Sequence, residues 1–295
     1  MKKVLTSLAK YPLFLISLLP FPIAYLLADV IYVIIYYAVG YRRSVVQNNL
    51  KNSFPEKSAA EITSIEKKFY HWLSDMMVES IKMASMSKRS ACKRLRLNNP
   101  EEISKHFEHG KPVMLVTAHY GNWEWGSLTL SASFKEPCLI VYKPQTNKTF
   151  EDILNRVRSR FGALLVPMQL TLRSILRHKG QAYWTVFLGD QTPVWQVAHY
   201  QTTFLNQPTA VFLGVEKIAK MMDAPVVFGH INRLKRGYYE ATFTTLTETP
   251  NATAENEITE THTRMLEGII QKRPELWLWS HKRWKNNRPA QHEHS

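Results

Sequence analysis

The sequence predicts an α/β fold, with a mixed central sheet that has helices on both faces, preceded by an N-terminal membrane-anchoring helical segment. Two observations predict it. From Pro112 onward, apolar runs rich in β-forming residues alternate with stretches of helical periodicity, which is typical of strands connected by helices. Upstream of them, residues 11–41 contain only one charged side chain, Asp29.

The nearly charge-free N-terminal segment is longer than the roughly 30 Å hydrocarbon core of a bilayer requires, although Pro20 and Pro22 divide it. Basic residues flank both of its ends, so the positive-inside rule does not fix an orientation. A cleaved signal peptide and a buried pair of core helices are the alternatives. We favour a membrane anchor that either spans the bilayer or lies in its interface.

A long helix is expected after the anchor. Ser58-Ala-Ala-Glu61 has the pattern of a capping box, in which side chain and backbone bond reciprocally at a helix start. Apolar residues then follow at helical spacing. They are Ile62, Ile65, Phe69, Trp72 and Met76.

The alternating region gives the remaining elements. The expected strands are Val113–Ala118, Cys138–Tyr142, Tyr183–Gly189, Pro225–Ile231 and Tyr238–Leu246. Helices are expected between them at Phe150–Arg160, Leu170–His178 and Ala210–Met222. The chain length suits one sizeable core, so we expect an anchor over residues 1–41, one domain over residues 42–288 and a disordered tail over residues 289–295.

The composition is strongly basic, with 38 Lys and Arg against 24 Asp and Glu, a net charge of +14. Such a surface suits anionic lipid head groups, an acidic protein or nucleic acid. The two cysteines, Cys92 and Cys138, have neither a disulfide-framework nor a metal-site spacing, which is consistent with a reducing compartment.

The most informative motif is His119-Tyr-Gly-Asn-Trp-Glu124, at the end of the strand Val113–Ala118. On one α-helix these two side chains would lie about 140° apart and would not meet. Across a strand-to-helix turn that Gly121 permits, Glu124 can fold back on the imidazole of His119. A carboxylate on one ring nitrogen leaves the other free to accept a proton from a hydroxyl. The alternative is a buried His beside a capping Glu.

Two further groups of polar residues lie where a site is expected. Asp190-Gln191 follows the strand Tyr183–Gly189 at its carboxyl end, where open α/β sheets place their ligands. Arg156, Arg158 and Arg160 alternate near the end of an expected helix, so they cannot share one helical face. A turn-starting Asp and a solvated helix end are the plain alternatives.

Near the C-terminus, Trp277–Lys285 interleaves tryptophans with basic residues. This mixture is typical of a membrane interface and also occurs in nucleic-acid binding, while a terminal segment that buries its tryptophans is the ordinary alternative. Because the chain already carries an anchor, we favour the membrane.

Several catalytic signatures are missing from the sequence. It contains no G-x-S-x-G, P-loop, G-x-G-x-x-G or H-E-x-x-H motif. The tail His-Glu-His is a weak metal candidate. Serine-hydrolase and zinc-hydrolase chemistry are therefore poorly supported, and we expect no metal and no cofactor.

In their order, these motifs resemble the late lipid A biosynthesis acyltransferases of the lauroyl and myristoyl type, within the lysophospholipid acyltransferase superfamily. The resemblance covers nearly the whole chain. It rests on Arg43-x4-Asn48-Asn-Leu-x3-Phe54-Pro-Glu, His119-x4-Glu124, Tyr142-Lys-Pro144, Arg158-x-Arg160-x-Gly162, Asp190-Gln191 and Trp279-x-His-Lys-Arg-Trp284. Lys143 departs from the Arg usual in the family, which removes a bidentate donor.

The resemblance implies an O-acyltransferase that moves a fatty acyl chain from an acyl-carrier-protein thioester to a hydroxyl of a lipid A precursor. His119 would be the general base, Glu124 would orient it, Arg158 would stabilise the oxyanion and Asp190 would support the site. The remaining candidates would bind substrate. They are Asn122, Tyr142, Lys143, Arg156, Arg160 and Gln191.

The implied partners are acidic acyl carrier protein, a phosphorylated glycolipid acceptor and membrane lipids, with no nucleic acid. The implied location is the bacterial inner membrane, with the catalytic domain on the cytoplasmic side. Two alternatives stay open: another lipid acceptor (an aminolipid, ornithine lipid or glycolipid), or a non-catalytic membrane-associated binding protein. The sequence leaves acyl-chain length, and coenzyme A as the donor, undecided.

Overall fold

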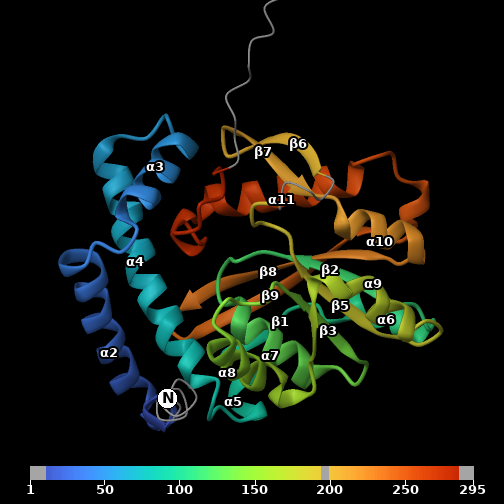
Figure 1. The fold of residues 1–295 in the computed structure, drawn as a ribbon, viewed down its shortest axis with the longest axis horizontal. Coiled ribbons are helices and arrows are strands. Elements are labelled where there is room, and N and C mark those ends of the chain that lie inside the picture. The colour runs from blue at the N-terminus through green and yellow to red at the C-terminus, as the bar shows by residue number, and fades with distance from the viewer. Residues whose placement is uncertain (1–10, 194–198, 286–295) are drawn as a thin grey trace, which may run out of the picture.

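A seven-stranded sheet in the order β1-β9-β8-β2-β5-β3-β4 crosses the centre of the computed structural model, which describes residues 11–193 and 199–285 (Figure 1). Most neighbouring strands are parallel, and β8 and β9 form an antiparallel pair. The predicted α/β fold with a mixed sheet is confirmed. The strands are β1 (Leu95–Leu97), β2 (Val113–Thr117), β3 (Cys138–Tyr142), β4 (Leu164–Pro167), β5 (Trp184–Leu188), β8 (Val226–Lys235) and β9 (Tyr238–Thr247).

The pairing of β2 with β5 positions the site. The two strands are parallel and in register from Val113 opposite Trp184 to Thr117 opposite Leu188. Their carboxyl ends therefore lie at the same edge of the sheet, so residues that follow Thr117 and Leu188 are brought together.

Helices cover both faces of the sheet (Figure 1). On one side lie α10 (Gly214–Met222), α11 (Glu257–Lys272) and the hairpin of β6 (His199–Phe204) and β7 (Gln207–Phe212). On the other lie α5 (Lys88–Arg94), α7 (Trp123–Ser133) and α8 (Lys148–Arg158). Along β2, Met114 and Val116 enter one hydrophobic cluster while Val113 and Leu115 enter the other, since successive strand residues face opposite sides.

The remaining helices lie at the edges of the sheet or beside it. They are α3 (Arg43–Ser53), α4 (Ala59–Lys82), α6 (Glu101–Glu108) and α9 (Thr171–Arg177). The capping box that begins α4 is confirmed, because the Ser58 side chain accepts from the Glu61 N–H while Glu61 Oε2 accepts from the Ser58 N–H at 2.8 Å.

The apolar N-terminal segment forms helices beside α4. Residues 11–18 are helical, and α2 (Phe21–Val33) continues through a π-helical turn, Ile34–Ala38. Phe21–Ala38 is long and apolar enough to cross a membrane. Yet α2 packs Ala24 and Ala28 against Val78 of α4, and the two helices lie side by side (Figure 1).

The structure adds strands that the sequence analysis missed, namely β1, β4, β6 and β7. The expectation of a helix over Ala210–Met222 is wrong at its start. Residues up to Phe212 pair with β6, and the helix begins only at Gly214. The expected disordered tail lies outside the described residues.

Candidate active site

The turn from β2 to α7 has the predicted strand-to-helix form. Gly121 adopts φ +64°, and a Cβ there would lie 2.0 Å from the Ile231 carbonyl oxygen, so only glycine fits. Asn122 caps α7, because its Oδ1 accepts from the Trp125 N–H at 2.9 Å. His119 therefore stands at the end of β2 and Glu124 in the first turn of α7.

The carboxylate that hydrogen-bonds His119 is Asp190, which corrects the expectation that Glu124 does so. Asp190 Oδ1 lies 2.7 Å from His119 Nδ1, and Asp190 Oδ2 accepts from the His119 backbone N–H at 2.9 Å. The physical reason is the β2–β5 pairing, which places the two residues at one edge of the sheet although 71 positions separate them.

Asp190 is buried, and both of its carboxylate oxygens accept hydrogen bonds. Its Oδ2 also accepts from Trp277 Nε1 at 2.8 Å. Burial opposes its ionisation, but the charge of His119 and the hydrogen bonds from His119 and Trp277 prevail and lower the pKa of Asp190 to about 2. At neutral pH an ionised carboxylate thus faces Nδ1 of the imidazole.

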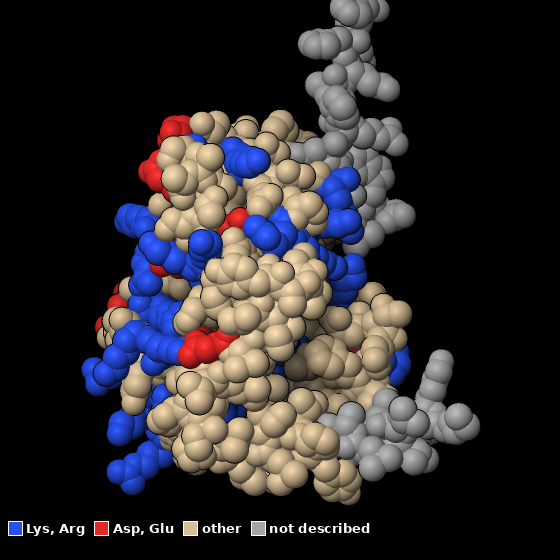
Figure 2. Space-filling model, turned by 90° about the vertical axis from the view of Figure 1, so that its left-hand side faces the viewer, with Lys and Arg blue, Asp and Glu red and all other residues tan. Residues whose placement is uncertain are grey.

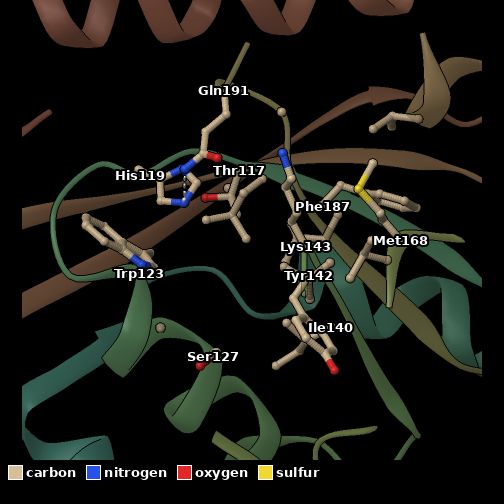
Figure 3. A pocket seen from close by; sticks show the side chains of 18 of the residues that line it. Thr117, His119, Trp123, Ser127, Ile140, Tyr142, Lys143, Met168, Phe187 and Gln191 are labelled. Atoms are coloured by element: carbon tan, nitrogen blue, oxygen red, sulfur yellow. Dashed lines mark hydrogen bonds between the residues drawn. The ribbon is translucent and has the colours of Figure 1, made fainter. Parts of the chain in front are cut away.

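The other ring nitrogen of His119 faces the cavity beside Gln191 (Figure 3). Gln191 Nε2 lies 3.1 Å from His119 Nε2. Because Asp190 accepts from Nδ1–H, Nε2 carries the lone pair and accepts from the Gln191 amide. This is the tautomer that a general base requires.

Glu124 instead pairs with Arg158. Arg158 Nε donates to Glu124 Oε2 at 2.8 Å, and Arg158 Nη2 donates to Oε1, so the contact is bidentate. Burial opposes ionisation of Glu124, but the charge and hydrogen bonds of Arg158 prevail and lower its pKa. Within the described part of the chain, Arg158 Nη1 has no acceptor, and Arg158 lines the cavity.

Asn122 was expected to bind substrate, but the structure buries it completely. Its Nδ2 donates to Glu79 Oε2 at 2.6 Å. Glu79 also accepts from Tyr25 Oη at 2.7 Å and Tyr239 Oη at 2.8 Å. Burial raises the pKa of Glu79 to about 7, partly offset by the tyrosine hydrogen bonds. Asn122 therefore fixes the turn rather than contacting the cavity, because α7 begins there.

A cavity of about 520 Å³ opens at His119. Its inner part lies between the sheet and α7, lined by Leu115, Leu130, Ile140, Val186, Ile231 and Phe243. Its mouth is polar, lined by His119, Glu124, Lys143, Gln145, Arg158, Gln191 and Lys285. An apolar chamber behind a polar mouth fits a long hydrocarbon with a reactive head group.

The other predicted substrate-binding residues divide into two groups. Tyr142 and Lys143 line the cavity at the end of β3 (Figure 3). Arg156 is exposed and does not line it. Arg160 donates to the carbonyl oxygens of Met83 and Met86, at 3.0 Å for Met86, so it braces the chain before α5 instead.

The C-terminal tryptophans do not form a membrane surface, which corrects that expectation. Trp277 and Trp279 are buried, with exposed fractions of 2% and 0%. Trp277 donates to Asp190, a role that no motif in the sequence indicates. His281 lines the cavity. Burial lowers the pKa of His281 to about 4, an effect that the charge of Asp190 partly offsets, so the His281 imidazole is neutral at pH 7.

No cluster of three or more potential metal ligands occurs among residues 11–193 and 199–285. The reactive groups that the structure brings together are an imidazole, two carboxylates, an amide and a guanidinium. They suit proton transfer and stabilisation of a developing oxyanion.

Residues 1–286 match the bacterial lipid A biosynthesis acyltransferase family, and the chain belongs to this family. The lipid A biosynthesis palmitoleoyltransferase of Escherichia coli K12 is 23% identical over 248 residues, which cover 83% of this chain and 79% of that protein. Lipid A biosynthesis acyltransferase 1 of Shigella flexneri is 23% identical over 256 residues (85% and 76%). The myristoyltransferase of E. coli K12 is 25% identical over 150 residues (51% and 46%).

Proposed function

We propose that the protein transfers a fatty acyl chain from an acyl-carrier-protein thioester to a hydroxyl of a lipid A precursor, at the cytoplasmic side of the inner membrane. One observation carries the proposal. The imidazole of His119 is held at Nδ1 by a buried carboxylate and presents Nε2 to a cavity with an apolar interior.

His119 acts as the general base. The acceptor hydroxyl replaces the Gln191 amide at Nε2 and gives up its proton as its oxygen attacks the thioester carbonyl carbon. Asp190 stabilises the imidazolium that forms. When the tetrahedral intermediate collapses, the C–S bond breaks and His119 returns the proton to the leaving thiolate. The products are an ester and a free thiol, and no covalent acyl-enzyme is needed.

Arg158 stabilises the oxyanion of that intermediate. Its Nε and Nη2 are held by Glu124, which fixes the plane of the guanidinium and leaves Nη1 available at the cavity. A positive charge that is already oriented stabilises a developing negative charge without reorganisation. Glu124 thus serves the reaction through Arg158, and Asp190 takes the part expected of Glu124.

The protein meets the membrane through the outward faces of α2 and of the helical residues 11–18, and through the segment after α2 up to Tyr41. The exposed apolar residues there are Tyr11, Phe14, Leu15, Leu18, Ile23, Leu26, Val30, Val33, Ile34, Tyr37, Val39 and Tyr41. Figure 2 views this side of the molecule and shows a broad uncharged surface bordered by Lys and Arg. Such a surface favours anionic lipid head groups around an apolar contact.

The α2 segment lies in the interface rather than crossing the bilayer. Its inner face packs on α4, and Asp29 pairs with Arg236 at 2.6 Å. Because α4 exposes Lys67 and Lys68 to solvent, it cannot follow α2 into hydrocarbon. A helix that lies along α4 therefore inserts only its outer face.

A phosphorylated acceptor suits the mouth of the cavity, where Lys143 and Lys285 supply positive charge. The alternative acceptors, an aminolipid, ornithine lipid or other glycolipid, use the same chemistry. The non-catalytic alternative is weakened because His119, Asp190 and Arg158 are all present and hydrogen-bonded in a form that suits catalysis.

The test is mass spectrometry of lipids from cells with the protein, without it, and with His119→Ala. We expect one acyl chain on lipid A to disappear in the last two. The matched control is His109→Ala, which removes an exposed imidazole away from the cavity and should preserve the chain. Loss of a different acylated lipid would identify another acceptor, and unchanged lipids with His119→Ala would refute the mechanism.

A further inference from the structure

α9 presents an apolar and basic face to solvent beside the mouth of the cavity. Thr171 and Ile175 point into the protein, with exposed fractions of 6% and 0%. Leu172 and Leu176 are 40% and 48% exposed and lie four residues apart, so they share the outer face. Arg173 and Arg177 are also exposed and four residues apart. We call Leu172, Arg173, Leu176, Arg177 and Lys179 the α9 surface.

The α9 surface carries positive charge without local compensation. The segment from residue 153 to residue 189 has no Asp or Glu, although it contains Arg156, Arg158, Arg160, Arg173, Arg177 and Lys179. Within the described chain, the side chains of Arg173, Arg177 and Lys179 form no ion pair or hydrogen bond. Arg233 and Arg236, by contrast, both pair with Asp75. Unpaired cations beside exposed leucines are suited to an acidic protein partner with apolar residues of its own.

The α9 surface is continuous with the cavity. Met168, Gln169 and Thr171, at the start of α9, line the mouth. The seven residues of α9 extend about 10 Å from there. A partner bound to this surface would therefore sit next to the opening that leads to His119.

The position of α9 favours a soluble partner over the bilayer. Figure 1 places α2 at the left edge of the molecule and α9 at the right, with the sheet between them. When the outer face of α2 lies on a membrane, α9 faces away from that membrane. Its leucines and arginines then meet molecules in solution.

We propose that the α9 surface is the docking site of the acidic carrier protein that delivers the acyl thioester. This inference rests on the proposed function and adds the location and chemistry of the donor contact. Acidic side chains of the carrier face Arg173, Arg177 and Lys179, and its apolar side chains cover Leu172 and Leu176. The thioester arm then enters the cavity past Gln169.

The test is Arg173→Glu/Arg177→Glu, assayed with an acylated carrier protein and with a small acyl thioester that has no protein part. We expect KM for the carrier-bound donor to rise at least about tenfold, while kcat/KM for the small donor stays unchanged. The control is Arg89→Glu/Lys93→Glu, which makes the same charge change at the same spacing on α5 and should affect neither donor. The wild-type KM for the carrier should also rise with salt, from roughly 0.05 to 0.5 M, more than that of the charge-reversed variant.

Other outcomes overturn the inference. An equal loss of kcat/KM with both donors would show that the α9 substitutions disturb the active site itself. A loss of vesicle binding with unchanged kinetics would show that the α9 surface contacts the membrane. Unchanged kinetics would exclude docking there. If the wild type used neither donor, the proposed function would fail, and direct titration of carrier protein against wild type and variant would still decide whether α9 binds it.

Discussion

At the scale of single residues, the site consists of two hydrogen-bonded pairs beside one cavity. His119 bonds Asp190, and Glu124 bonds Arg158. His119, Glu124, Arg158 and Asp190 lie together, as expected from the sequence, whereas Asn122, Arg156 and Arg160 do not line the cavity. The sequence alone pairs His119 with Glu124 because these two lie close along the chain. Partner choice depends on strand order, and a Trp277 that supports Asp190 from 87 positions away leaves no local pattern.

Double-mutant cycles should separate the two pairs. His119→Ala should lower turnover by roughly two to four orders of magnitude, and His119→Ala/Asp190→Asn should be little worse, because the two residues act as a unit. Glu124→Gln and Arg158→Ala should likewise be non-additive with each other, yet additive with His119→Ala. Non-additivity between His119 and Glu124 alone would restore the pairing expected from the sequence.

Asp190 should also make the protein acid-sensitive. Its pKa falls from the usual 3.8 to about 2 on folding, so its contribution to stability is present above pH 4 and is lost as the pH falls from about 4 to 2. That difference corresponds to about 2 kcal/mol. Melting temperatures in detergent should therefore fall with acid more steeply for the wild type than for Asp190→Asn. Parallel curves would count against an ionised Asp190.

At the scale of elements, buried apolar strands were predictable and marginal ones were not. β2, β3 and β5 lie inside the sheet and consist mainly of apolar residues, interrupted in β5 by Thr185. β4 has four residues and lies at the edge of the sheet, so its signal is weak. The β6–β7 turn has Leu205 and Asn206 at positive φ. Because the glycine that is usual in such turns is absent, the sequence carries only a weak signal for this hairpin.

The β2–α7 turn is the element on which the site most depends. Gly121→Ala would place a Cβ against the Ile231 carbonyl oxygen, and only a shift of the backbone could relieve this clash. We expect the free energy of unfolding to fall by on the order of 3 kcal/mol or more. Gly110→Ala is the matched control, because Gly110 has a similar φ of +66° and open space around it. The control should lower Tm by about 2–4 °C with activity intact. Equal effects of the two changes would show that φ alone matters.

At the scale of the whole molecule, we propose that the basic surface contacts two kinds of partner. The predicted anionic partners have separate sides: lipid at the face of α2, and an acidic carrier at the opposite side in the arrangement that we propose (Figure 1). Net charge indicated the classes of partner, but the positions of their contacts depend on tertiary structure. The tryptophan cluster shows this, since packing against Asp190 overrode an interface-like composition.

Membrane attachment should depend on the outer face of α2. Leu26→Ser/Val30→Ser removes two side chains with 68% and 53% exposure, each able to contribute about 1.5–2 kcal/mol in an apolar phase. Binding to vesicles that contain anionic lipid should fall at least about tenfold in a sedimentation assay. Leu164→Ser/Met221→Ser, which alters two exposed apolar residues elsewhere, should bind normally. Equal binding by both variants would exclude this face.

The hydrogen bonds around Glu79 have a practical consequence for anyone who engineers this enzyme. Tyr25 of α2 and Asn122 of the β2–α7 turn share that one carboxylate. In the arrangement that we propose, α2 therefore supports the β2–α7 turn through Glu79 as well as contacting the membrane. Trimming it to obtain a freely soluble catalyst would remove a support of the turn. Replacing α2 with a foreign transmembrane sequence would restore membrane localisation but would leave the activity impaired.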